Sequence, residues 1–386
     1  MIEHSPNPAA IRRLRWLIVI TLIATLSVIV LGAFTRLADA GLGCPDWPTC
    51  YGHLWVPNSA DDIATANQAF PDTPVLAGKT WPEQFHRILA SSLGLLCLVV
   101  LFQVLRYFPR KVWSLQVTLL GLLILSTIVR AFIGHQLDIL LIIMVLLYFS
   151  SLAFVPWQAK GLNLRLPLFV AGWVVLQGLF GMWTVTLKLW PQVVTLHLLG
   201  GFTLLSVLWW QSLRLTVINM AALIAPIKTL AQVGLVVVVI QITLGGWTTS
   251  NYAALACPDL PYCQGQLWPD PDFAEGFNVL QHVGPNYLGG QMDNGGRVAI
   301  HLAHRIGAIT VTLVLGWLAF ALYRLRSKKL ALLLATVLTT QVALGISNVA
   351  FFLPLPVAVL HNLFGALLLL TLITINYCAT ERSDND

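Results

Sequence analysis

The chain has 386 residues, of which 57% are hydrophobic and only 10% are charged. A soluble domain carries about 25% charged residues, so this composition excludes a water-soluble globular protein and indicates an integral membrane protein. The net charge of +6 does not indicate a nucleic-acid partner, because the positive residues of membrane proteins collect on one side of the bilayer.

Ten apolar runs follow one another along the chain, and each is long enough to cross a bilayer as a helix with its backbone groups bonded internally. The first run lacks a nearby small-residue cleavage site, so we interpret it as a retained span and not as a signal peptide. The expected spans are residues 15–34, 86–107, 112–134, 138–157, 166–187, 193–213, 229–248, 299–322, 330–350 and 356–378.

Basic residues are distributed unevenly between the two sides that ten spans define. Fifteen fall on the side of the termini and seven fall on the other side. This bias predicts that both termini are cytoplasmic and that the long loops 35–85 and 249–298 are external.

Parts of the sequence occur twice. Residues 44–52 (Cys-Pro-Asp-Trp-Pro-Thr-Cys-Tyr-Gly) recur as residues 257–265 (Cys-Pro-Asp-Leu-Pro-Tyr-Cys-Gln-Gly), and six positions from Gln177 to Gly201 recur 164 residues later. We therefore expect an all-α membrane protein of two homologous four-helix bundles, in a parallel pseudo-two-fold repeat about an axis along the membrane normal. The expected units are residues 1–228 and 229–386.

The first unit is longer than the second. The excess of 54 residues lies between His86 and Gln177, where there are two additional apolar runs. Because one span takes about 20 residues, the excess accommodates an inserted helical hairpin at about residues 110–165. Its turn, at residues 134–138, is expected to be external.

Four histidines occur at repeat-equivalent places near the external ends of their spans: His86, His197, His304 and His361. Imidazole is expensive at membrane depth without a partner, so such residues are candidates for function. Two histidines on different helices of one bundle can bind a haem iron from both faces. A lone histidine is more simply explained by a hydrogen bond to a neighbouring helix, but the repeated arrangement favours two haem sites. No role is assigned to the remaining histidines, which include His53, His135 and His282.

Charged residues beside these histidines differ between the two units. Arg87 and Arg305 suit either haem propionates or an interfacial position with the charge in water. Glu83 lies three residues before His86 and shares its helix face, whereas the equivalent position in the second unit is His301. An acid beside one haem only suggests that the first site performs chemistry and the second moves electrons. A solvated loop acid is the alternative.

Two cysteine pairs lie in the expected external loops, Cys44 with Cys50 and Cys257 with Cys263. An oxidising outer compartment favours disulfides, and the intervening Pro-Asp-x-Pro favours a tight turn that brings the thiols together. A metal site is disfavoured because no local histidine completes a set of four ligands.

Several motifs occur in a fixed order along the chain: Gly32-x-x-Thr35-Arg36 leading into Gly41-Leu42-x-Cys44-Pro45-Asp46-Trp47-Pro48, then Glu83-x-x-His86-Arg87, Gln177-x-x-x-Gly181-x-x-Thr184-Val185, His304-Arg305 and Gln341-x-x-x-Gly345-x-x-Asn348-Val349. In this order they resemble the haem A synthase family. The resemblance covers nearly the whole chain apart from residues 110–165, since the family pattern has eight spans. A second departure is Thr249, at the position equivalent to Arg36.

The resemblance implies an enzyme that oxidises the methyl group of haem O to the formyl group of haem A, for use in cytochrome c oxidase. It implies that His86 and His197 face the substrate haem, and that His304 and His361 ligate a haem b that passes electrons. Glu83 would be a catalytic acid or base, and the pair of Cys44 and Cys50 would be redox-sensitive.

The same resemblance implies a location in the bacterial inner membrane or in a mitochondrion. The implied partners are haem O synthase, the cytochrome c oxidase assembly apparatus, membrane lipid and a quinol or other electron donor.

Two other functions compete with this one. A two-haem electron carrier of the quinol-linked cytochrome b type predicts equivalent haems and no need for Glu83. A transporter built from parallel repeats is disfavoured, because no span is broken near its midpoint and the unusual polar residues cluster at one end. The colour of the protein separates a haem protein from a transporter, and the identity of its haem separates the enzyme from the carrier.

Overall fold

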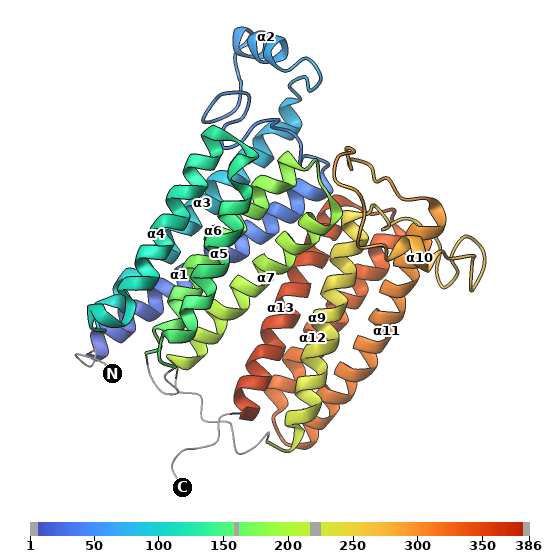
Figure 1. Ribbon diagram of the computed structural model, residues 1–386. Helices are drawn as coiled ribbons and strands as arrows, with labels where there is room; N and C mark the ends of the chain where they lie inside the picture. Colours follow the sequence, from blue (N-terminus) through green and yellow to red (C-terminus); the bar gives the residue numbers. More distant parts are fainter. Residues whose placement is uncertain (1–6, 158–161, 217–224, 381–386) are drawn as a thin grey trace. The chain divides into compact units, whose positions relative to one another are not determined.

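The computed structural model describes residues 7–157, 162–216 and 225–380, and these residues form helices and loops without a β-strand (Figure 1). Nine of the described helices are long and apolar enough to cross a membrane. The predicted all-α membrane protein is therefore confirmed. The nine helices are α1 (Pro8–Leu37), α3 (Ala77–Leu105), α4 (Arg110–Ile133), α6 (Arg165–Thr186), α7 (Pro191–Arg214), α9 (Lys228–Ser250), α11 (Asn294–Arg324), α12 (Lys328–Ala350) and α13 (Leu355–Thr380).

The tenth predicted span is a shorter helix. Helix α5 (Asp138–Ser151) has 14 residues and is extended at its two ends by 3₁₀ turns at His135–Leu137 and Leu152–Phe154. At 1.5 Å per residue, 14 residues reach about 21 Å, which is less than a hydrocarbon core of about 30 Å. An ion pair between Arg130 and Asp138, with Nε and Oδ1 2.9 Å apart, joins the end of α4 to the start of α5.

Two helices begin earlier than their apolar runs predict. Helix α3 begins at Ala77 instead of residue 86, and α11 begins at Asn294 instead of residue 299. Apolar runs mark the part of a helix that lies in hydrocarbon, whereas the backbone continues its hydrogen bonding into the polar interface. As a result Glu83 and His301 lie within helices and not in the loops that precede them.

Packing divides the chain into two compact units. The first contains Met1–Leu31, Gly43–Thr186 and Thr203–Val217, and the second contains Gly32–Leu42, Leu187–Phe202 and Ile218–Asp386. In the first unit α6 packs against α3 and α4, and α5 packs against α4 and α6. The expected halves, 1–228 and 229–386, were defined by the sequence repeat and not by packing. They remain a prediction.

Four helices of the second unit close into a ring. Helix α11 packs against α9 and α12, and α13 packs against α12 and α9, so α11 and α13 are diagonal partners (Figure 1). Close approach and polar bonds hold membrane helices together. Leu315 of α11 lies 3.0 Å from the place where a side chain on Gly234 of α9 would begin. The buried Asn376 amide of α13 donates to the Ala231 carbonyl of α9 over 2.9 Å.

Candidate functional site

The first cysteine pair closes a small loop ahead of α3. Cys44 and Cys50 are disulfide-bonded. The Asp46 carboxylate inside this loop accepts hydrogen bonds from the backbone N–H groups of Tyr51 (2.6 Å) and Gly52 (2.8 Å). Both donors have positive φ angles, 54° and 79°. The Asp46 side chain therefore fixes a turn that the backbone would not favour on its own.

The second cysteine pair closes a loop of the same construction ahead of α11. Cys257 and Cys263 are disulfide-bonded. Asp259 accepts hydrogen bonds from the N–H groups of Gln264 (2.7 Å) and Gly265 (2.8 Å). These bonds, with Gly265 contributing most, hold the pKa of the Asp259 carboxyl below its usual range. Both predicted cysteine pairings are confirmed.

Glu83 and Arg87 fasten the first loop to α3. The Cys44 N–H donates to Glu83 Oε2 over 2.9 Å, and the Arg87 guanidinium pairs with Oε1 of the same carboxylate. Arg87 also donates to the carbonyls of Asp46 (2.8 Å) and Thr49 (2.9 Å). Glu83 is only 4% exposed. A buried carboxylate is tolerated here because a guanidinium and a backbone N–H both bind it.

His301 and Arg305 occupy the corresponding positions beside the second loop. His301 Nδ1 lies 3.4 Å from the Cys257 nitrogen and 3.0 Å from the Ala253 carbonyl oxygen. A single ring nitrogen either accepts or donates, so a neutral imidazole satisfies one of these two groups at a time. Arg305 donates to the carbonyls of Tyr262 (2.7 Å) and Cys257 (2.8 Å).

The two loops are therefore held in the same way except at one position. Both arginines direct N–H groups at loop carbonyls, and their expected contact with haem propionates remains a prediction. The predicted equivalence of Glu83 and His301 extends to their contacts, since each approaches the N–H of the first cysteine of its loop. A carboxyl group thus stands in the first unit where an imidazole stands in the second.

His304 of α11 is seated against α9. Its Nδ1 lies 3.1 Å from Gln241 Nε2, which also donates to the His304 carbonyl over 3.0 Å. The imidazole Cε1 lies 3.2 Å from the position that a Cβ on Gly245 would occupy. A side chain at this position would crowd the ring, so glycine permits the close approach.

His361 of α13 packs against α12 in the same way, and we call each such contact with a glutamine and a glycine a histidine seat. Its Nε2 lies 3.4 Å from Gln341 Nε2, and its Cε1 lies 3.1 Å from the Cβ position of Gly345. The Nδ1 atom of His361 is buried and has no hydrogen-bond partner among the described residues. Each of these two histidines therefore meets a Gln-x-x-x-Gly segment of an adjacent helix.

The two seats lie at one end of the bundle. His304 and His361 lie in the first halves of α11 and α13, which are diagonal helices. A haem iron needs one axial ligand from each face, and two histidines on opposite helices of a bundle can supply them. Within the described ranges no group of three or more His, Cys, Asp or Glu side chains has the arrangement of a metal site. Haem ligation by this pair of histidines remains a prediction.

His86 and His197 belong to different units. His86 lies on α3 in the first unit, and His197 lies in the second unit, on the first part of α7. This part of α7 packs against α9, where the Thr195 and Ser250 hydroxyls are 2.9 Å apart. The joint role predicted for His86 and His197 remains a prediction.

Gln241 is a site residue that sequence reasoning missed. The spacing Gln-x-x-x-Gly occurs at Gln241, as it does at Gln177 and Gln341. Gln177 and Gln341 stand out because they are equivalent positions of the repeat. Gln241 does not, because the equivalent residue in the first half is Val28. A search for the spacing alone would have found all three.

The disulfides are expected to contribute little to stability. Closing a loop of six residues restricts the unfolded chain by about 2 kcal/mol, and the Asp46 and Arg87 hydrogen bonds remain when Cys44 and Cys50 are changed to Ser. We expect this double variant to lower the thermal unfolding temperature only slightly. Mass spectrometry of non-reduced peptides checks the pairing itself, and free thiols at all four positions would refute it.

Comparisons with known proteins cover almost the whole chain. The model of the COX15-CtaA family, described as cytochrome oxidase assembly protein, matches residues 15–137 and 133–373. A protein of Shewanella oneidensis named Heme A synthase is 41% identical over 377 residues, which are 97% of this chain and 98% of the relative. Proteins of the same name from Novosphingobium aromaticivorans and Caulobacter sp. are 26% and 27% identical, over 94% and 93% of this chain and 95% and 93% of the relatives.

Proposed function

The chain belongs to the COX15-CtaA family of cytochrome oxidase assembly proteins, and from this membership we propose that it is a haem A synthase. The proposed reaction oxidises the methyl group of haem O to the formyl group of haem A. The observation that carries the proposal is the pair of histidine seats in the ring of α9, α11, α12 and α13. It supports a resident haem in a protein whose relatives are named for haem chemistry.

We infer that His304 and His361 hold a haem b. The buried Nδ1 of His361 and the glycines beside both rings support this assignment, because an axial imidazole needs a fixed orientation and close helix approach. Gln241 and Gln341 would orient the two rings. When bound, this haem supplies reversible one-electron chemistry, and the protein around it excludes water.

Glu83 is proposed to act as a general acid or base beside the substrate haem O, which His86 and His197 would face. Oxidation of a methyl group must move protons as well as electrons, and a positioned carboxylate can accept or deliver them. Glu83 also fastens the disulfide loop through Cys44 and Arg87. Proton uptake by this carboxylate would weaken both contacts, so protonation and loop seating are coupled in this proposal.

The difference between the units supports an enzyme over a plain electron carrier. A carrier with two equivalent haems needs no carboxylate in one unit only. The outer end of α3 presents Glu83, and the outer end of α11 presents His301 with the same loop contact. We therefore assign the chemistry to the first half of the sequence, residues 1–228, and electron transfer to the second half, residues 229–386.

Contacts between repeat-equivalent residues support the proposed pseudo-two-fold repeat. Arg36 Nη2 donates to the Thr249 carbonyl over 2.6 Å, and the Tyr252 hydroxyl donates to Asp39 Oδ1 over 3.0 Å. Both pairs are 213 residues apart, which is also the offset between the cysteine motifs. A two-fold axis passes where a residue meets its own counterpart. The repeat proposal keeps the halves 1–228 and 229–386, with the hairpin at 110–165 as an insertion.

We propose that both termini are cytoplasmic, in the inner membrane of a bacterium. The acidic residues support this orientation as a second and separate pattern. Twelve of the sixteen acids fall in segments expected to be external, within 35–85, 134–138 and 249–298, and the other four lie in the two termini. The loops on the other side contain only basic and neutral residues. Of the basic residues used for orientation, Lys160 and Arg382 lie outside the described residues.

Reporter fusions test this orientation and the short helix α5 together. Fusions after Lys160 and after His135 are expected to report opposite sides of the membrane, with Lys160 cytoplasmic. Alkaline phosphatase and green fluorescent protein activities measure the two sides. If both fusions report one side, the pair of α4 and α5 does not cross as a hairpin.

The partners we propose follow from the reaction. Haem O synthase would supply the substrate, the cytochrome c oxidase assembly apparatus would take the product, and a quinol or other donor would exchange electrons with the haem b.

The bound pigment tests the function directly. Purified protein is expected to be red with a bis-histidine spectrum. Extraction should yield haem b together with haem O that carries hydroxyl or formyl groups. Unmodified haem b as the sole pigment, in cells that make haem O, would favour the two-haem electron carrier. Colourless protein would contradict both.

A further inference from the structure

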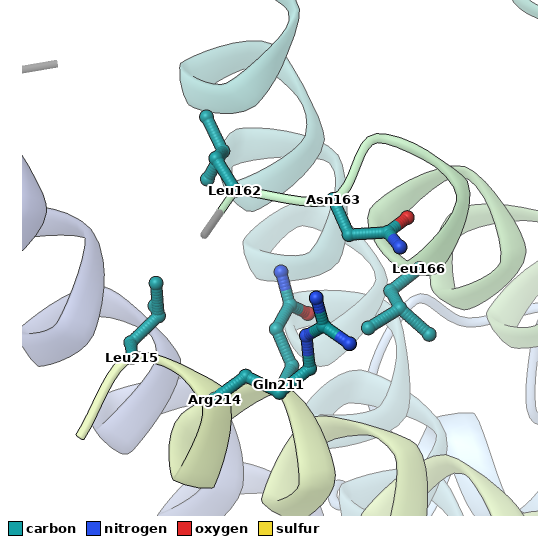
Figure 2. Close-up of a pocket in the computed structure, with 6 residues that line it drawn as sticks. All are labelled: Leu162, Asn163, Leu166, Gln211, Arg214 and Leu215. Carbon is teal, nitrogen blue, oxygen red and sulfur yellow. The ribbon is translucent and has the colours of Figure 1, made fainter. Parts of the chain in front are cut away.

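A small pocket lies in the first unit at the end away from the disulfide loop. It is formed where the segment before α6 meets the last turns of α7. Figure 2 shows the Gln211 and Arg214 side chains extending from α7 toward the segment that carries Asn163. Its lining consists of Leu162, Asn163, Leu166, Gln211, Arg214 and Leu215.

The pocket has polar walls that are buried. Asn163 and Gln211 are each only 4% exposed. The Oε1 atom of Gln211 is buried and has no hydrogen-bond partner in the described part of the chain. An amide oxygen in this state is costly unless a donor reaches it. The pocket therefore combines an acceptor that needs a donor with the guanidinium of Arg214, and no acidic side chain lines it.

A second arginine and a tryptophan stand beside the pocket. The guanidinium groups of Arg214 and Arg165 lie 5.7 and 5.8 Å from the centre of the Trp157 ring. Arg165 is also held by the Val155 carbonyl, to which its Nε donates over 3.0 Å. Tryptophan rings of this kind mark the level of lipid headgroups. Two cations are thus gathered at headgroup depth.

The size of the pocket limits what can enter. Its volume is about 10 Å³, which accommodates one water-sized group. A ligand would place a single hydroxyl or oxygen inside and keep its remaining atoms at the mouth. The lining also contains three leucines, Leu162, Leu166 and Leu215, which make part of the pocket apolar.

We propose that this pocket binds the headgroup of an anionic phospholipid that carries hydroxyl groups, the chemistry of phosphatidylglycerol. The phosphodiester accepts from Arg214 and Arg165, and a headgroup hydroxyl donates to Gln211 Oε1. Basic pockets between membrane helices favour anionic headgroups in this way. The proposal is independent of haem chemistry.

Native mass spectrometry of the purified full-length protein tests the proposal. The protein is titrated separately with phosphatidylglycerol, phosphatidylethanolamine and inorganic phosphate. We expect one phosphatidylglycerol to be retained in preference to phosphatidylethanolamine, and Arg214→Gln to weaken its binding about fivefold. The control is Arg324→Gln, which removes an exposed charge from the last turn of α11 and should leave binding unchanged.

Each other result overturns the proposal. Equal weakening by Arg214→Gln and Arg324→Gln would mean general attraction by surface charge. Equal retention of phosphatidylethanolamine would remove the anionic requirement. Competition by inorganic phosphate at equal concentration would make free phosphate the ligand. If Arg214→Gln does not fold, Gln211→Leu gives a charge-neutral test, with a similar loss of phosphatidylglycerol expected and no loss counting against the site.

Discussion

Replacing His304 or His361 with alanine is expected to remove the tightly held haem of the second unit and to lower product formation by more than about 100-fold. Each histidine has its own seat, against Gly245 or against Gly345. No other imidazole takes the same position when one of them is lost. Without both axial ligands the haem b would lose its fixed position, and the supply of electrons from the donor to the substrate haem would stop.

The haem content of purified protein measures this effect. Pyridine haemochrome spectra give the amount of haem b per chain, and extraction gives the haem O and haem A present. His282→Ala is a matched control, because the His282 side chain is exposed and only its backbone carbonyl is bonded, to the Tyr287 hydroxyl. Full haem b content in both His304→Ala and His361→Ala would contradict the assignment.

Replacing Glu83 with glutamine is expected to stop turnover while the haem of the second unit stays in place. Glutamine keeps the size of the side chain and an oxygen that can accept from the Cys44 N–H. The amide cannot exchange a proton, and it carries no charge to pair with Arg87. Losing a general acid or base lowers rates by about 10²–10⁴-fold, so unreacted or partly oxidised haem should accumulate. The Glu83→Ala variant should behave in the same way.

Comparing the glutamine and alanine variants separates chemistry from loop fastening. If Glu83 only anchors the loop, glutamine should retain most activity. Both variants break the buried ion pair with Arg87. Alanine also removes the acceptor of the Cys44 N–H, so it would then lose more activity and more stability than glutamine. Asp72→Ala is the control, because Asp72 is an exposed acid of the same external segment. Loss of the second-unit haem in a Glu83 variant, with normal product from what remains, would mean that the two sites are assigned the wrong way round.

The helices were predictable because burial in hydrocarbon leaves a strong and uniform pattern. All ten apolar runs correspond to helices, including the short α5. The first turns of α3 and α11 were not predictable from that pattern, since they are polar and amphipathic. These turns carry Glu83 and His301, so hydropathy alone misses the most informative part of the molecule.

The candidate site was predictable where a motif constrains its own geometry. The cysteine pairs lie six residues apart around a turn, and both are bridged. The targets of Arg87 and Arg305 were not predictable, because they are loop carbonyls whose directions depend on the folded turn. The contact of Gln241 with His304 joins positions 63 residues apart, and it required the packing of α9 against α11.

The contacts of Arg36 with Thr249 and of Asp39 with Tyr252 have a consequence for symmetry. In a dimer of identical subunits, a residue on the two-fold axis meets a copy of itself. Two arginines or two aspartates placed there would repel each other. A single fused chain is free of that restriction, so a cation can meet a carbonyl and a hydroxyl can meet a carboxylate. In the proposed repeat, covalent joining of the two halves thus permits unlike residues near the axis, and the same freedom allows one half to keep Glu83 while the other keeps His301.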